Sequence, residues 1–113
     1  MSPHTRIVVV ASLVAAVALL SIRVGHGAAD KPVKHTVTME AVAFKPDVVE
    51  AKRGDSIVWI NNDPFPHTVT ASGKFDSKEI KPGASWTYKV QQSGDMPYIC
   101  ALHPTMKATL RVK

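Results

Sequence analysis

Beyond residue 34 the chain consists of short stretches in which hydrophobic and polar residues alternate. Val, Ile, Thr and aromatic residues dominate these stretches, and a period of two is typical of half-buried β-strands. Residues that favour turns (Pro, Gly, Asn and Asp) separate them, as at positions 61–64 and 81–83. The pattern therefore predicts an all-β sandwich or barrel. Its strands are expected at residues 35–39, 47–52, 56–61, 67–72, 84–90 and 106–112.

The first 29 residues follow a different pattern. A polar head with Arg6 precedes an apolar run at 7–22 that only Ser12 and Ser21 interrupt, and Gly and Ala gather at 25–29. This is the order of a secretory signal peptide, and the run is shorter than the roughly 20 residues that a membrane-spanning helix needs. We expect residues 1–29 to be a signal peptide, with an uncleaved anchor as the alternative, and residues 30–113 to form the exported domain.

The expected domain carries little net charge. Of the 14 Lys and Arg residues, Arg6 and Arg23 lie in the leader, which leaves 12 basic residues against 9 acidic ones. So small and scattered a surplus does not favour nucleic-acid binding. A domain of this size is marginal without a cross-link, yet its one cysteine cannot form a disulfide within its own chain. A metal that ties two loops together would supply the missing stability.

That cysteine lies in the stretch YICALHPTM, which places Cys100, His103 and Met106 within seven residues. Taken singly, the cysteine and methionine would be core residues, and His103 and the distant His67 would be surface or loop residues. Taken together, two imidazoles, one thiolate and a weak axial thioether are the ligand set of a blue-copper electron-transfer site. Structural zinc does not usually bind methionine. Flanking prolines disfavour a helix, so we expect Cys100 at a strand end, His103 in the turn and Met106 at the start of the next strand.

Four stretches, NNDPFPHTVTA, FDS, KPGASWTYKV and MPYICALHPTMKATLRV, resemble the cupredoxins, specifically the amicyanin and plastocyanin branch. The resemblance covers nearly all of residues 35–113. Gaps of two residues on either side of His103, with Pro104 directly after it, are most similar to amicyanins. The resemblance implies a Greek-key β-sandwich that holds one type 1 copper ion, with His67, Cys100, His103 and Met106 as its ligands.

Two residues depart from the amicyanin pattern. Thr68 stands where amicyanins have Asn, whose backbone N–H points at the cysteine sulfur and whose side chain braces the ligand loop. We expect Thr68 to keep the N–H contact and to make the brace more weakly or differently. Leu102 stands where amicyanins have Pro, which has no N–H. We predict that the Leu102 N–H donates a second hydrogen bond to the sulfur of Cys100, favouring Cu(I).

The resemblance implies a periplasmic electron carrier, not an enzyme, that cycles between Cu(II) and Cu(I). Its partners would be transient redox proteins: a periplasmic dehydrogenase as electron donor and a c-type cytochrome as acceptor. We expect a monomer that meets the membrane only if the leader is retained. His103 should lie nearest to solvent, framed by Leu102, Pro104, Pro64 and Phe65 as an apolar docking surface.

Two other classes of function remain open. A copper-delivery or storage protein would use the same ligands without redox turnover. An enzyme would use Cys100 as a nucleophile and a histidine as its base, although no third orienting group is evident. The tripeptide Arg53-Gly54-Asp55 also matches a cell-adhesion motif, but a glycine turn that leads into the strand at 56–61 explains it.

Overall fold

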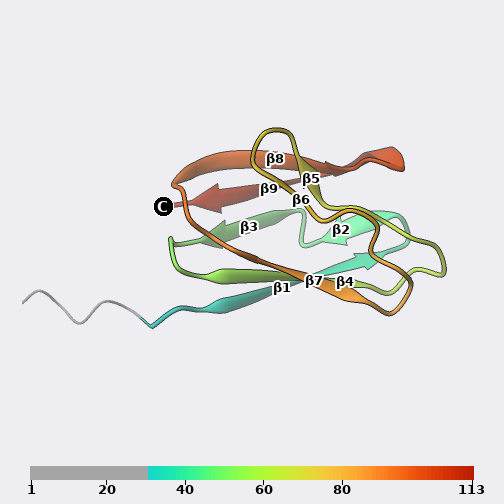
Figure 1. The fold of residues 1–113 in the computed structure, drawn as a ribbon, viewed down its shortest axis with the longest axis horizontal. Coiled ribbons are helices and arrows are strands. Elements are labelled where there is room, and N and C mark those ends of the chain that lie inside the picture. Colours follow the sequence, from blue (N-terminus) through green and yellow to red (C-terminus); the bar gives the residue numbers. More distant parts are fainter. Residues whose placement is uncertain (1–30) are drawn as a thin grey trace, which may run out of the picture.

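Two β-sheets packed face to face make up residues 31–113, the part of the chain that the computed structural model describes (Figure 1). The strand orders are β2-β1-β4-β7 in one sheet and β3-β9-β8-β5-β6 in the other. The predicted all-β sandwich is confirmed. Among these residues no helix is long and apolar enough to cross a membrane. The predicted leader lies outside the described residues.

The chain crosses several times between the two sheets. The four-stranded sheet contains β1 (Lys34–Glu40), β2 (Ala43–Lys45), β4 (Ser56–Asn61) and β7 (Ser85–Lys89). The five-stranded sheet contains β3 (Val48–Ala51), β5 (Thr70–Ala71), β6 (Phe75–Asp76), β8 (Gly94–Cys100) and β9 (His103–Val112). Parallel pairs β1–β4 and β3–β9 join segments that are distant in sequence, and antiparallel β8–β9 forms the hairpin that carries the cysteine.

The structure departs from the predicted strands in several places. Strands β2 and β6 were not predicted, and β9 begins at His103 instead of residue 106. The strand expected at 67–72 is reduced to β5, with an isolated bridge between His67 and Ile80 before it. Of strand β8 only the end at Cys100 was expected, because Pro97 interrupts the alternating pattern before it. Only Ile99 of β8 pairs with β5, so one edge of β8 has no neighbouring strand at Pro97. Open edges are where sheets accommodate proline.

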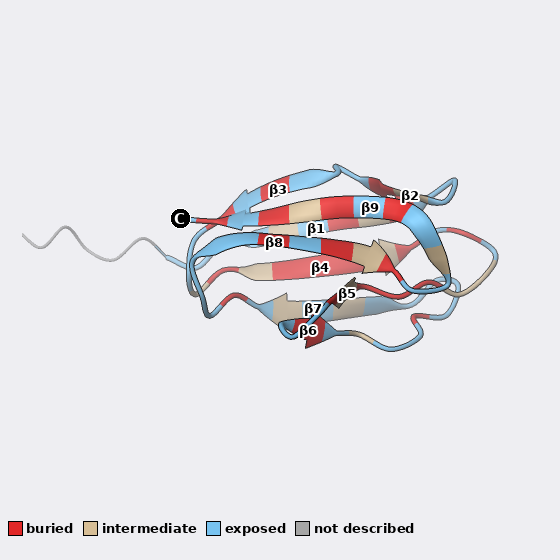
Figure 2. Cartoon of the chain, turned by 90° about the horizontal axis from the view of Figure 1, so that it is seen from above, coloured by how far each residue is buried: buried red, intermediate tan, exposed pale blue. Residues whose placement is uncertain are grey.

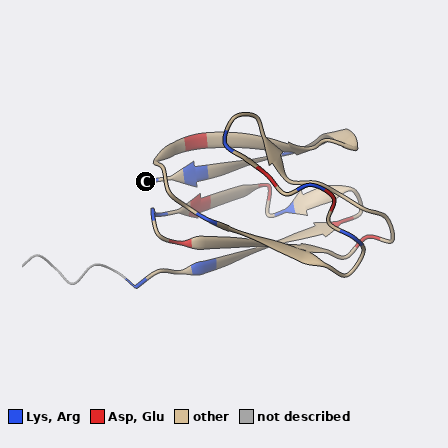
Figure 3. Ribbon diagram, in the orientation of Figure 1, with Lys and Arg blue, Asp and Glu red and all other residues tan. Residues whose placement is uncertain are grey.

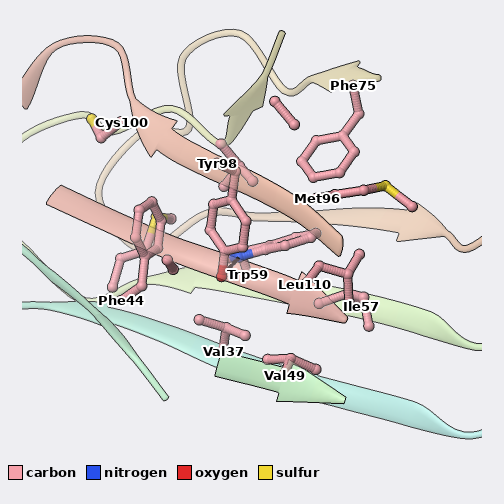
Figure 4. Close-up of a cluster of buried hydrophobic side chains, with 14 of the residues drawn as sticks. Val37, Phe44, Val49, Ile57, Trp59, Phe75, Met96, Tyr98, Cys100 and Leu110 are labelled. Atoms are coloured by element: carbon pink, nitrogen blue, oxygen red, sulfur yellow. Dashed lines mark hydrogen bonds between the residues drawn. The ribbon is translucent and has the colours of Figure 1, made fainter. Parts of the chain in front are cut away.

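The core lies between the sheets, and β4 is buried over most of its length (Figure 2). Trp59 and Tyr98 are almost fully buried at its centre, and Trp59 Nε1–H donates a hydrogen bond to Tyr98 Oη at 3.2 Å (Figure 4). Burial raises the pKa of Tyr98 to about 12. The ring of Phe44 packs edge-on against that of Tyr98, with centroids 4.8 Å apart. Trp59 and Phe44 are thus packing residues of this core.

Basic and acidic residues are interspersed over strands and loops (Figure 3), and two carboxylates, those of Asp55 and Asp63, are buried. Asp55 accepts hydrogen bonds from the backbone N–H groups of Val33 and Lys52, at 2.9 and 3.0 Å, and contacts His35 Nε2 at 2.9 Å. His35, near the start of β1, is thus tied to Asp55. The same contacts occupy the carboxylate of Arg53-Gly54-Asp55, so this tripeptide is a structural turn.

Candidate metal centre

The β8–β9 hairpin and one separate loop meet at the end of the sandwich. Cys100 is the last residue of β8 and pairs across the tight turn with His103, the first residue of β9. Cys100 therefore lies at a strand end, as predicted, but His103 begins the next strand instead of lying in the turn. Met106 lies three residues further into that strand. His67 comes from the loop after β4, where its backbone N–H and carbonyl bridge to Ile80.

Three of the four predicted donor side chains converge. The distances from Cys100 Sγ to the Nδ1 atoms of His67 and His103 are 3.5 and 3.6 Å. All three donor atoms lie within 4.8 Å of one another. At metal–nitrogen and metal–sulfur bond lengths of about 2.0 and 2.3 Å, donors roughly 3.7 Å apart would lie at a trigonal angle around one ion. The donor set and its spacing therefore fit a bound copper ion.

The four predicted ligands differ in how far they are buried. Cys100 and His67 are fully buried, Met106 is 2% exposed and His103 is half-buried. Met106 belongs to the same buried hydrophobic cluster as Cys100. Only His103 brings a donor ring to the surface.

The orientation of the His67 ring is set by Asp63, which sequence reasoning missed. His67 Nε2 lies 2.7 Å from Asp63 Oδ2. A carboxylate only accepts hydrogen bonds, so Nε2 carries the proton and the lone pair of Nδ1 faces Cys100 Sγ. Burial of Asp63 opposes ionisation, but hydrogen bonds from His67, Val42 and Ala41 outweigh it and hold the carboxyl pKa below its usual range.

Thr68 contacts both the cysteine sulfur and the turn that follows it. Its backbone N–H donates to Cys100 Sγ at 3.3 Å, as predicted. Its hydroxyl oxygen accepts a hydrogen bond from the Ala101 N–H at 2.7 Å and lies 2.9 Å from the hydroxyl of Thr70. The hydroxyl thus braces the ligand loop in a different way from the asparagine of amicyanins, as expected.

The second sulfur hydrogen bond predicted for Leu102 is not confirmed. Among the described residues, the backbone N–H that donates to Cys100 Sγ is that of Thr68. The Leu102 side chain is 46% exposed beside the half-buried His103. Phe65 contacts both imidazoles, with ring centroids 5.2 Å from His67 and 5.4 Å from His103. Leu102 and Phe65 thus provide apolar surface around the accessible ring.

In this β-sandwich, a hairpin at a strand end and a distant loop bring two imidazoles to one buried cysteine. This arrangement defines a class of metal-binding β-proteins. Residues 9–112 match the model of the cupredoxin-like domain, and the chain belongs to this family. The predicted family is thereby confirmed.

Individual relatives agree with this assignment. The chain is 32% identical over 104 residues to chloroplastic plastocyanin of Tetradesmus obliquus, an alignment that covers 78% of this chain and 68% of that protein. It is 28% identical over 83 residues to amicyanin-alpha of Methylorubrum extorquens, covering 68% and 70%. A solved Cu(I) structure of an amicyanin mutant matches with a TM-score of 0.68 and 20% identity, covering 71% of this chain and 82% of that one, which is a likeness of fold.

Proposed function

We propose that the protein is a one-electron carrier that binds a single type 1 copper ion through His67, Cys100, His103 and Met106. The observation that carries this proposal is the convergence of two imidazole Nδ1 atoms on Cys100 Sγ at 3.5 and 3.6 Å. The buried thioether of Met106 on the same hairpin would be the soft fourth donor of such a site.

When bound, copper supplies a Cu(II)/Cu(I) couple that changes by one electron. The chain holds the donors in nearly one arrangement for both states: Thr68 donates to the sulfur, and Asp63 fixes the His67 ring. Full burial of Cys100 and His67 excludes water from that side of the site. Little rearrangement therefore accompanies the gain or loss of an electron.

His103 is the route by which an electron would enter or leave, because it is the most exposed of the four ligands. Exposed Leu102 and the ring of Phe65 surround it with apolar surface. A small apolar contact suits a transient redox encounter. By family resemblance, we propose a periplasmic dehydrogenase as donor and a c-type cytochrome as acceptor, with the protein acting as a periplasmic monomer.

The test is a visible spectrum of the purified domain after addition of Cu(II), followed by reduction and reoxidation. We expect intense thiolate-to-copper absorption that disappears on reduction and returns on oxidation. Cys100→Ser should remain colourless, while Asp95→Asn, an exposed site, serves as the control. Copper bound without this absorption would favour the delivery or storage alternative. A domain that binds no copper would contradict both functions.

A further inference from the structure

Asp63 joins a ligand to a distant turn of the backbone. Its Oδ1 accepts the N–H of Ala41 at 2.7 Å, and its Oδ2 lies 2.9 Å from the N–H of Val42 and 2.7 Å from His67 Nε2. Asp63 is 7% exposed, and one of its oxygens thus serves both the turn and the imidazole. The β1–β2 turn, residues 41–42, is therefore connected to the candidate metal centre through one side chain.

That turn has an unfavourable backbone conformation. The φ angles of Ala41 and Val42 are 53° and 57°, in the left-handed region that non-glycine residues seldom adopt. Val42 is β-branched, for which this region is especially unfavourable. The two backbone N–H groups that point at Asp63 belong to these same residues. The carboxylate thus compensates for the strain of the turn that it contacts.

Asp63 is itself held by Asn61, a fully buried polar residue at the end of β4. Asn61 Oδ1 accepts the N–H of Asp63 at 2.9 Å, and its Nδ2 donates to the carbonyl oxygens of Phe65 and Ile80, both at 2.9 Å. These contacts fix the loop from Asn61 to His67 on both sides of the carboxylate. The position of Asp63 is consequently set before any metal binds.

We propose that Asp63 is a positioning residue of the metal centre, an inference that rests on the proposed copper function. It keeps the proton of His67 on Nε2 and Nδ1 free for the ion, and its negative charge stabilises Cu(II) relative to Cu(I). It also transmits the conformation of the β1–β2 turn to the His67 ring. A change in the conformation of the β1–β2 turn therefore alters the position of the His67 ring, although the turn itself does not contact the ion.

Asp63→Asn tests the proposal. Three N–H donors share the two carboxylate oxygens of Asp63, whereas an asparagine side chain offers them one oxygen. The expected results are a mixture of His67 tautomers in the copper-free protein, weaker Cu(II) binding by about 10- to 100-fold, and a higher reduction potential. Asp95→Asn is the matched control, since it removes the same charge from an exposed strand position. A ring tautomer and a potential equal to those of the control would overturn the proposal.

The double variant Asp63→Asn with Val42→Gly distinguishes the effect of Asp63 on the His67 ligand from its effect on the β1–β2 turn. Glycine adopts positive φ without strain, so it should restore much of the stability that Asp63→Asn loses. It should not restore the potential or the His67 tautomer. Recovery of all three would show that Asp63 acts only through the fold and would contradict the proposal.

The unmodified protein provides the remaining test. In the copper-free wild type, nitrogen NMR should find the His67 ring proton on Nε2, exchanging slowly with water. A proton on Nδ1 would overturn the inference even if Asp63→Asn does not fold. This measurement requires no copper, so it can succeed while the proposed function fails. Conversely, a normal blue spectrum with Nδ1 protonated in the copper-free protein would reject the role of Asp63 alone.

Discussion

The backbone nitrogen of Ala101 lies 2.7 Å from the hydroxyl oxygen of Thr68. Thr68, which follows the proposed ligand His67, therefore fixes the turn that follows the proposed ligand Cys100. Thr68 also donates its own N–H to Cys100 Sγ at 3.3 Å. The sulfur and the first residue of the turn are thus held by the backbone and the side chain of a single threonine. The two contacts can be separated by mutation, because only one of them needs the hydroxyl.

Thr68→Val should lower the free energy of unfolding by about 1 kcal/mol, since it leaves the Ala101 N–H without its acceptor and keeps the backbone N–H on the sulfur. Denaturant titration measures the change. Thr68→Ser retains a hydroxyl and is the control, with a smaller expected loss. If valine and serine destabilise the protein equally, the hydrogen bond to Ala101 is not the cause.

Tyr98→Phe should destabilise the protein by about 1 to 3 kcal/mol, because the indole N–H of buried Trp59 loses its acceptor. The copper spectrum should not change, since neither residue is a proposed ligand. The measurement is denaturant unfolding, with Tyr88→Phe as the control at a half-buried position. A loss no larger than that of the control would mean that the hydrogen bond adds nothing to stability.

Asp55 should make stability depend on acid pH. Hydrogen bonds from Val33, His35 and Lys52 lower its pKa to about 2 in the folded state, against a value near 3.8 without them. A depressed folded-state pKa stabilises the protein above about pH 4, and this contribution disappears as the pH falls toward 2. Melting temperatures of wild type and Asp55→Asn should therefore differ at neutral pH and converge below pH 4. A constant difference down to pH 2 would contradict the assignment.

Leu102→Ser should slow electron exchange between two copies of the protein by roughly tenfold, equivalent to about 1.4 kcal/mol, because each copy loses apolar contact area beside His103. The visible spectrum should be unchanged. NMR line broadening in mixtures of oxidised and reduced protein measures the rate. Val33→Ser changes an equally exposed apolar side chain elsewhere and should leave the rate as it is. Equal rates for both variants would rule out docking at Leu102.

Much of the site could be predicted from the sequence because its chemistry is local. The spacing of Cys100, His103 and Met106 specifies a hairpin with soft donors, and the turn before His67 marks a second loop. Asp63 could not be recognised in the same way, because its backbone partners lie more than twenty residues upstream. Within the Asn61–Pro64 stretch its polar side chain looks like an ordinary turn residue.

The fold, too, could be predicted from the sequence only in part. Alternation alone identified most of the long strands, since one face of each is buried. It did not give the extent of β8, of which only the end at Cys100 was expected, because a proline there conflicts with strand propensity. Only the tertiary arrangement shows that the edge at Pro97 has no neighbour. The short strands β2 and β6 depend on pairing with partners, which a stretch of two or three residues does not encode.

Three of the four proposed ligands belong to one stretch of seven residues, and only His67 must be brought from a distance. A denatured chain therefore keeps most of the donor set within a flexible loop that can still wrap around the ion. Any affinity of that denatured chain for copper is subtracted from the stabilisation that the metal gives to the native state. The gain in melting temperature on loading should consequently fall short of what the native affinity alone would give, and His67→Ala, which leaves the local three untouched, should bring it close to zero.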